Sequence, residues 1–295
     1  MPTRLRVRLE CRGGAVDAVV RPSHALHGVR QLTILIHGYN ADECAAWRSY
    51  ARFLAESDLE SHPLATGTVC TFYWPGDASL GWFSGASYPL ELAAARRSAA
   101  QLLAFLRELA AAAGDLAVAL VCHSLGNRVA LELLKAYVEA GAPAGLRFTS
   151  ACLMAAAVPV RLVEDAQRLG RAAAAVAGRR TLVLYSESDG VLRWAFPSGE
   201  TAIPGEGWFP TAVGRFGDPD RTWGEREDLA PYGHGDYWRG RQAAGYVRRL
   251  LGIASPAPAR TAAIAARPLP AATLGSRTLP RRRVSDDRPG CCDES

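Results

Sequence analysis

A serine inside a turn-like pentapeptide is the strongest candidate for a catalytic residue in this chain. The pentapeptide CHSLG (residues 122–126) joins an apolar segment ending at Cys122 to a helix-like segment beginning at Leu125. Such a strand–turn–helix context strains the serine and lifts its hydroxyl clear of the sheet. Strand and helix approach closely there, so the flanking residues must be small. Gly126 satisfies this, while Cys122 replaces the more usual glycine. The pattern predicts that Ser124 is a nucleophile, with a plain capped helix start as the alternative.

A serine hydroxyl is a poor nucleophile unless a base removes its proton. In sites built on this kind of turn, the acid and the histidine follow the serine in that order. His234 is the only one of the six histidines that follows Ser124, and glycines flank it just before the last helix-like segment. We therefore expect His234 to be the base. The alternative is an ordinary histidine in a surface loop.

The acid that orients this base should follow a strand between the serine and the histidine. The apolar segment 181–185 is such a strand, and SESDG follows it. Asp189 is the first choice, because its neighbour Gly190 permits a turn that aims the carboxylate back. Glu187 is the second choice and Asp218 the third. Each of the three could also be a solvated loop carboxylate.

The developing oxyanion of an acyl-transfer reaction needs backbone donors. One should be the N–H of Leu125, directly after the nucleophile, and the second should come from the loop after an earlier buried strand. That loop is HGYN (residues 37–40), in which Gly38 lets the backbone turn and the N–H of Tyr39 would point into the site. His37 ends the strand and is expected to be structural rather than catalytic.

The segments that must position these groups alternate between strand-like and helix-like patterns. The expected strands are residues 4–9, 15–20, 31–37, 68–74, 116–122, 148–155 and 181–185, the first two as an antiparallel pair. The expected helices are the segment capped by Asn40 and residues 88–113, 125–140, 161–177 and 237–251. This alternation predicts an α/β fold, with a mostly parallel sheet of about eight strands covered by helices on both faces.

Two segments depart from this rhythm. Residues 192–235 are rich in glycine, proline and aromatic residues without a clear period, which is typical of a functional loop or of hidden short elements. The chain after residue 252 consists mainly of Pro, Ala, Arg and Ser without aromatics. We therefore expect a catalytic domain over residues 1–252 and a disordered tail over residues 253–295.

Aromatic residues gather in two loops that should flank the serine. Trp82 and Phe83 lie between glycines in the first loop, and Trp194 begins the second. Ligand sites are concave, mostly apolar and formed by loops above the sheet. We therefore expect Trp82, Phe83 and Trp194 to bind substrate and to favour medium acyl chains over acetate. The alternative is a satellite core beneath the long loop.

Composition excludes several classes of protein. The 295 residues are 49% apolar and 21% charged, which argues against a disordered chain or a coiled coil. The apolar runs are far shorter than the ~20 residues of a membrane helix, so no membrane span is expected. The tail carries seven arginines against four acidic residues, so little of the net charge of +5 belongs to the body and no nucleic-acid partner is expected.

Cysteine usage and the first residues indicate the compartment. The seven cysteines are odd in number and lack C-x-x-C spacing, which argues against a disulfide scaffold or a zinc site. The first residues alternate charged and apolar side chains and lack the apolar stretch of a signal peptide. A cytoplasmic protein is expected.

Three motifs together resemble a widespread group of bacterial α/β-hydrolases. Its members carry H-G-[FY]-N, a W-P pair after the next strand, and H-S-[ML]-G-N-R. The matching stretches here are residues 37–40, 74–75 and 123–128, and the resemblance covers about residues 30–240. It implies an α/β-hydrolase fold with the triad Ser124, Asp189 and His234.

The expected reaction is hydrolysis of a carboxylic ester or thioester through an acyl-serine intermediate. Its substrate would be a small acyl ester, and neither a cofactor nor a metal is required. An acyltransferase or an amidase would use the same triad and differ only in the acceptor or the bond cleaved. A catalytically idle member of the fold that serves as a binding module is the rival of another class.

Overall fold

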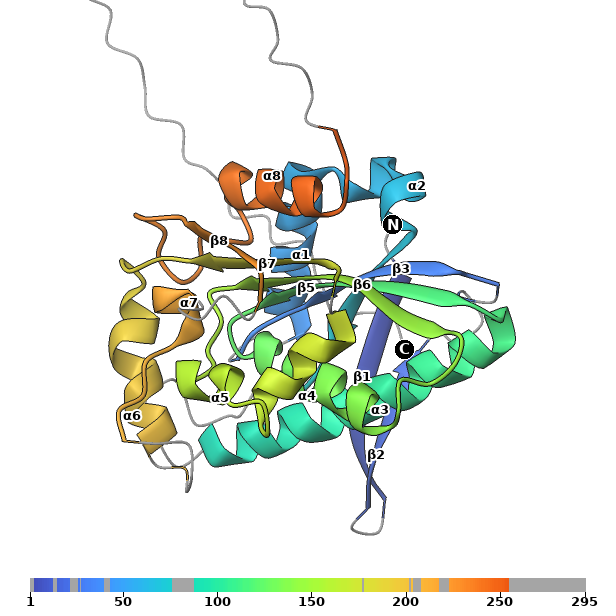
Figure 1. The fold of residues 1–295 in the computed structure, drawn as a ribbon, viewed down its shortest axis with the longest axis horizontal. Coiled ribbons are helices and arrows are strands. Elements are labelled where there is room, and N and C mark those ends of the chain that lie inside the picture. The colour runs from blue at the N-terminus through green and yellow to red at the C-terminus, as the bar shows by residue number, and fades with distance from the viewer. Residues whose placement is uncertain are drawn as a thin grey trace, which may run out of the picture. The chain divides into compact units, whose positions relative to one another are not determined.

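The computed structural model describes residues 3–12, 15–21, 26, 28–39, 43–75, 88–176, 178–201, 203, 208–217 and 223–254 (Figure 1). The chain divides into the units Met1–Ser255 and Pro256–Ser295. The predicted tail lies outside the described residues, apart from its first two positions, and its disorder stays a prediction. The fold below is that of the first unit.

The centre of this unit is an eight-stranded sheet with the order β2-β1-β4-β3-β5-β6-β7-β8. Its strands are β1 Thr3–Arg12, β2 Ala15–Arg21, β3 Gln31–Ile36, β4 Thr68–Tyr73, β5 Leu116–His123, β6 Leu146–Met154, β7 Arg180–Tyr185 and β8 Glu225–Asp228. Only β1 and β2 pair antiparallel, and all other neighbours are parallel. The predicted α/β class with a mostly parallel sheet is confirmed.

Helices cover both faces of the sheet (Figure 1). The α-helices are α1 Glu43–Ser57, α2 Pro63–Thr66, α3 Tyr88–Ala113, α4 Gly126–Glu139, α5 Val160–Glu164, α6 Phe196–Thr201, α7 Val213–Phe216 and α8 Arg241–Leu250. The described residues also include the 3₁₀ helices η2 Leu59–Ser61 and η3 Leu169–Val176 and the π-helix η4 Val191–Ala195. Within the described residues, no helix has the length and apolar character to cross a bilayer.

The alternation of side chains along β3 shows how the two layers form. Ile34 and Ile36 point into a core cluster shared with α3 and α4. Leu35 points the other way, into a cluster shared with α1 and α8. Strand β5 lies between β3 and β6 and is buried along its whole length. A strand covered on both faces needs a continuous apolar run, and this run delivers Ser124 to the carboxyl edge of the sheet.

Most strands differ from the predicted ranges by one to three residues, and two helices differ more. The helix expected over residues 161–177 is divided into α5 and η3, because Asp165 leaves the helical region at φ −78° and ψ 107°. The last helix begins at Arg241 rather than at Tyr237, whose ring packs near His123 instead. The patternless segment 192–235 does contain short elements, namely most of η4, α6, α7 and β8.

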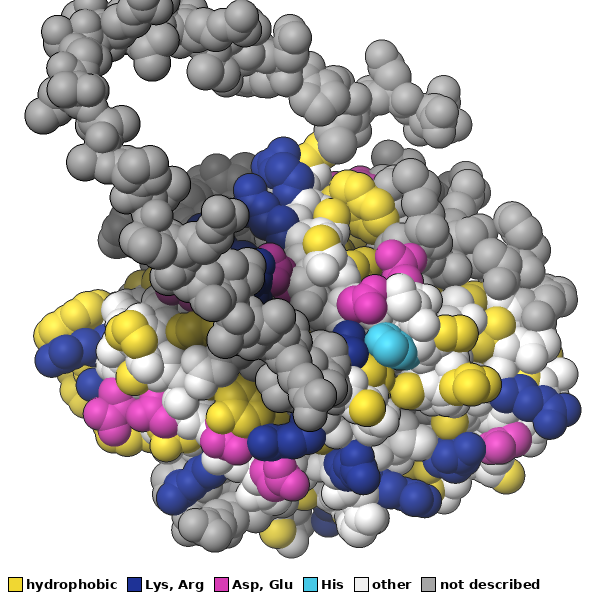
Figure 2. Space-filling view, turned by 90° about the horizontal axis from the view of Figure 1, so that it is seen from above, with side chains coloured by type: hydrophobic (Ala, Val, Ile, Leu, Met, Phe, Trp, Pro, Cys, Tyr) yellow, Lys and Arg dark blue, Asp and Glu magenta, His cyan; other side chains and the backbone are white. Residues whose placement is uncertain are grey.

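Helix α8 is tied to its surroundings by surface ion pairs. Arg241 pairs with Glu56 of α1 at 3.2 Å, and Arg249 pairs with Glu227 of β8 at 2.8 Å. Figure 2 shows basic and acidic side chains interspersed on one face of the molecule. Exposed pairs contribute about 0–1 kcal/mol each, so they position α8 more than they stabilise the fold.

Close approach of α4 to β3 generates a stability prediction. A Cβ on Gly126 would lie 2.2 Å from the carbonyl oxygen of His37, whereas a Cβ on Gly245 in α8 would meet nothing within 4 Å. We expect Gly126→Ala to lower the free energy of unfolding by about 1–3 kcal/mol. Gly245→Ala should leave it unchanged or raise it by up to ~1 kcal/mol, because alanine favours helix. Denaturant unfolding of both variants checks this, and equal stabilities would contradict the close packing.

Candidate active site

Ser124 lies in a strained turn between β5 and α4. Its φ of 53° falls in the left-handed region, which costs a non-glycine residue about 1–3 kcal/mol. Its N–H donates to the carbonyl of Met154 at 3.0 Å, and its own carbonyl accepts from the N–H groups of Asn127 at 3.1 Å and Ala157 at 3.2 Å. The Asn127 side-chain amide also donates to the carbonyls of Ser124 and Met154, both at 2.9 Å. At about 0.5–1.5 kcal/mol each, these bonds suffice to hold the turn.

A hydrogen-bonded chain leads from this serine to a buried carboxylate. His234 Nε2 lies 2.7 Å from Ser124 Oγ, and His234 Nδ1 lies 2.8 Å from Asp189 Oδ2. In the neutral imidazole one of the two nitrogens carries a proton, and the hydrogen bond to Asp189 Oδ2 places that proton on Nδ1. Nε2 is then free to accept the serine proton, so the arrangement can activate Ser124 as a nucleophile.

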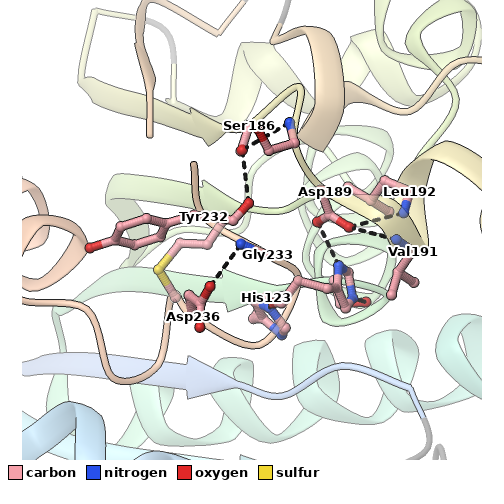
Figure 3. A network of polar contacts seen from close by, with 12 residues as sticks. His123, Ser186, Asp189, Val191, Leu192, Tyr232, Gly233 and Asp236 are labelled. Atoms are coloured by element: carbon pink, nitrogen blue, oxygen red, sulfur yellow. Dashed lines mark hydrogen bonds and ion pairs between the residues drawn. The ribbon is translucent and has the colours of Figure 1, made fainter. Parts of the chain in front are cut away.

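The carboxylate of Asp189 is fully buried but has hydrogen-bond partners on both oxygens. Its Oδ1 accepts from the N–H groups of Val191 and Leu192, each at 3.0 Å (Figure 3). Gly190 has ordinary helical backbone angles, φ −66° and ψ −29°. The predicted glycine turn is therefore not what aims the carboxylate, and the first amides of η4 do so instead.

Of the other two candidate acids, the structure describes Glu187, which does not reach this position. Glu187 is exposed to solvent, and Asp218 lies outside the described residues. The structure thus brings the first-choice acid, Asp189, to His234. No group of three or more His, Cys, Asp or Glu side chains that could hold a metal ion occurs in the part of the chain that the structure describes.

The two expected oxyanion donors lie at the same cavity as the serine. Tyr39 and Leu125 both line it, together with Ser124 and His234. Within the described residues, the N–H of Leu125 makes no hydrogen bond and remains available. Gly38 brings the loop after β3 against the serine, since a Cβ there would lie 2.6 Å from Ser124 Cβ.

The cavity beside the serine has mostly apolar walls and a volume of about 60 Å³. Its further lining residues come from the loop after β6 and from η4 and α6: Ala157, Val191, Leu192, Ala195 and Phe196.

Of the three predicted substrate-binding aromatics, the structure describes Trp194 alone. Trp194 does not line the cavity: it is 63% exposed, with the Arg193 guanidinium 5.0 Å from its ring centroid. Trp194 lies away from the cavity because one turn of helix puts residues 191, 192, 195 and 196 on one face and residue 194 on another, so its substrate contact stays a prediction. Trp82 and Phe83 lie outside the described residues, so their role stays a prediction.

Comparison with known protein families identifies the fold family. Residues 23–193 match the family described as alpha/beta hydrolase of unknown function (DUF900). The chain belongs to this family. The comparison with curated proteins gives no match.

Solved structures similar to this α/β-hydrolase are distant. An esterase from the fungus Rhizomucor miehei is 12% identical, over 83% of this chain and 81% of that one, with a TM-score of 0.42. A predicted CIB-like hydrolase from Thermoplasma acidophilum is 16% identical, over 80% and 88% of the chains, with a TM-score of 0.39. An esterase from Pyrobaculum calidifontis is 12% identical, over 76% of each chain, with a TM-score of 0.41. TM-scores this low carry no argument about function.

His37 of the hydrolase holds the backbone that enters the cavity. Its Nε2 accepts from the N–H of Trp74 at 3.2 Å, and its Nδ1–H donates to the carbonyl of Gly38 at 2.7 Å. The Trp74 indole N–H also donates to the His37 carbonyl at 2.8 Å. The Gly38 carbonyl and the Tyr39 N–H share one peptide, so this ring fixes the direction of that N–H. The H-G and W-P motifs were visible in the sequence, but their contact across 37 positions was not.

His123 connects the serine turn to the loop that carries His234. Its Nε2–H donates to the backbone carbonyl of His234 at 2.8 Å, and its ring packs near Tyr237 and Trp238. Sequence reasoning treated His123 only as part of the motif. Nothing in the local pattern reveals a contact with a residue 111 positions away.

Further contacts brace the same loop. The Ser186 hydroxyl donates to the carbonyl of Tyr232 at 2.8 Å, and the Gly233 N–H donates to Asp236 at 2.7 Å (Figure 3). Two residues before the serine, Cys122 is fully buried, and its burial raises the pKa of its thiol well above the ordinary value. Cysteine thus fills the position before His123 as a small neutral side chain.

The buried histidines make the hydrolase sensitive to acid. Burial lowers the pKa of His37 to about 4 and that of His123 to about 3, from an ordinary value of 6.5. Between pH 6.5 and about 4 the unfolded chain binds protons that the folded chain does not. The free energy of unfolding should therefore fall with falling pH, by about 1.4 kcal/mol per pH unit for each histidine.

Urea unfolding between pH 7 and 4.5 measures this slope. We expect His123→Gln to make it shallower, because one of the two buried groups no longer titrates. Gly245→Ala, which changes no titratable group and adds a Cβ in open space, is the control and should keep the wild-type slope. A wild-type slope in His123→Gln would show that its ring is not held neutral.

Proposed function

We propose that the protein is a serine hydrolase that cleaves a carboxylic ester or thioester through an acyl-serine intermediate. The observation that carries this proposal is the hydrogen-bonded chain Ser124–His234–Asp189, with contacts of 2.7 and 2.8 Å, at the wall of an apolar cavity. Membership of an α/β-hydrolase family agrees with it. The fold alone hosts many functions, so the proposal rests on the geometry of the site.

In the acylation step, Ser124 Oγ attacks the carbonyl carbon of the substrate while His234 Nε2 takes its proton. The carbonyl oxygen becomes an anion, which the N–H groups of Tyr39 and Leu125 stabilise. Each preorganised donor of this kind contributes about 10²–10³-fold to kcat. The imidazolium then gives its proton to the departing alcohol or thiol, leaving the acyl group on Ser124.

In the deacylation step, a water molecule attacks the acyl carbon and His234 Nε2 takes its proton. The tetrahedral intermediate collapses, the carboxylic acid leaves, and Ser124 Oγ regains its proton from the imidazolium. Asp189 remains a carboxylate throughout and stabilises the positive ring from its buried position. Its two bonds from η4 keep it oriented in both steps.

The first test is the nucleophile. Ser124→Ala should abolish labelling by a fluorophosphonate probe and lower kcat for p-nitrophenyl butyrate by as much as about 10⁶-fold, because no other group replaces the attacking oxygen. The exposed Ser188→Ala is the matched control and should label and hydrolyse like the wild type. Unchanged melting temperatures establish that both variants fold. Labelling of folded Ser124→Ala would refute the mechanism.

The second test is the acid. Asp189→Asn should lower kcat by about 10⁴-fold, since the amide cannot hold the histidine tautomer that accepts the serine proton. Glu187→Gln changes an exposed carboxylate two residues away and should have little effect. Steady-state kinetics of the two variants decide the assignment, and a larger loss in Glu187→Gln would transfer the role to Glu187.

A further inference from the structure

We propose, building on the serine-hydrolase function above, that residues 191–196 form the specificity element and select an uncharged, apolar acyl group. This segment comprises η4 and the first residue of α6. It forms part of the wall of the cavity that Ser124 and His234 also line.

The side of this segment that lines the cavity is apolar. It presents Val191, Leu192, Ala195 and Phe196, spaced as one face of a helical turn. Leu192 and Phe196 are 1% and 4% exposed, so their side chains are packed rather than free in solvent. Arg193 and Trp194 occupy the outer, exposed face of the same turn.

The described residues that line the cavity offer no ion-pair partner for a charged acyl group. Its polar lining consists of Tyr39, Ser124 and His234, which the proposed reaction uses. Of the described residues that line it, none is a lysine, an arginine, an aspartate or a glutamate. A carboxylate at the far end of an acyl chain would lose its hydration there without gaining an ion pair.

The wall is coupled to the catalytic carboxylate. The backbone N–H groups of Val191 and Leu192 hold Asp189 Oδ1 at 3.0 Å, while the same residues line the cavity. The wall therefore cannot recede to admit a larger or hydrated group without releasing the acid. Substrate selection and the orientation of His234 depend on one short segment.

The wild-type test compares p-nitrophenyl esters of acetate, butyrate, hexanoate and adipate with the full chain. We expect kcat/KM to rise by about fourfold for each methylene that the cavity encloses. Hexanoate and adipate have the same number of carbons, and the adipate monoester, with its terminal carboxylate, should react at least ~100-fold more slowly. Equal rates for these two, or acetate as the best substrate, would overturn the inference.

Variants of the segment separate its two faces. Ala195→Phe should lower the hexanoate-to-acetate ratio by about tenfold or more, and Ala195→Lys should raise the adipate-to-hexanoate ratio by a similar factor. Trp194→Ala, on the exposed face, should change neither ratio. The inference is overturned if the Trp194 variant shifts the ratios as much as the Ala195 variants do, or if neither Ala195 variant shifts them.

Failure of the underlying function is distinguishable. If the wild type neither labels with a fluorophosphonate nor hydrolyses any ester, the serine mechanism itself is wrong and the inference falls with it. Labelling with a flat chain-length and charge profile leaves the mechanism intact and removes only the specificity role of residues 191–196.

Discussion

The left-handed backbone at Ser124 is the constraint on which the rest of the site depends. It turns the chain sharply from β5 into α4, and the turn exists only because neighbouring backbones come unusually near. A Cβ on Gly126 would clash with the carbonyl of His37, and a Cβ on Gly38 would clash with the serine side chain. Asn127 then ties the serine carbonyl to β6. The strain is offset locally, so the hydroxyl stands where the ring of His234 can reach it.

Around this turn, polar groups are buried in neutral or fully paired form. His37 and His123 each donate a hydrogen bond to a backbone carbonyl and stay uncharged, because burial disfavours their cationic forms. Asp189 is fully buried and makes contacts through both carboxyl oxygens. In the proposed reaction, new charge therefore arises on the His234 ring and on the substrate oxygen. The ring lies beside Asp189, and the oxygen would lie beside the N–H groups of Tyr39 and Leu125.

The sequence predicted the parts of the site that depend on order and local pattern. Ser124, Asp189 and His234 come together as their order in the chain suggested, because parallel strands bring their carboxyl ends to one edge. The sequence could not predict features that depend on which way a side chain points or on contacts between residues far apart in the chain. Trp194 is apolar, but apolarity does not tell which face of a helix it occupies. Strand β8 reads ERED, an exposed edge without the apolar pattern that identifies a strand.

The buried sulfur beside the serine turn has a practical consequence. Burial raises the pKa of Cys70 to about 12 and that of Cys122 well above its ordinary value, so neither thiol is ionised near neutral pH. A thiolate is the form that reacts with alkylating reagents. Alkylation of Cys122, followed by peptide mass, therefore measures how often β5 opens to solvent. The rate of alkylation reports on the stability of the serine turn, and its measurement requires neither substrate nor turnover.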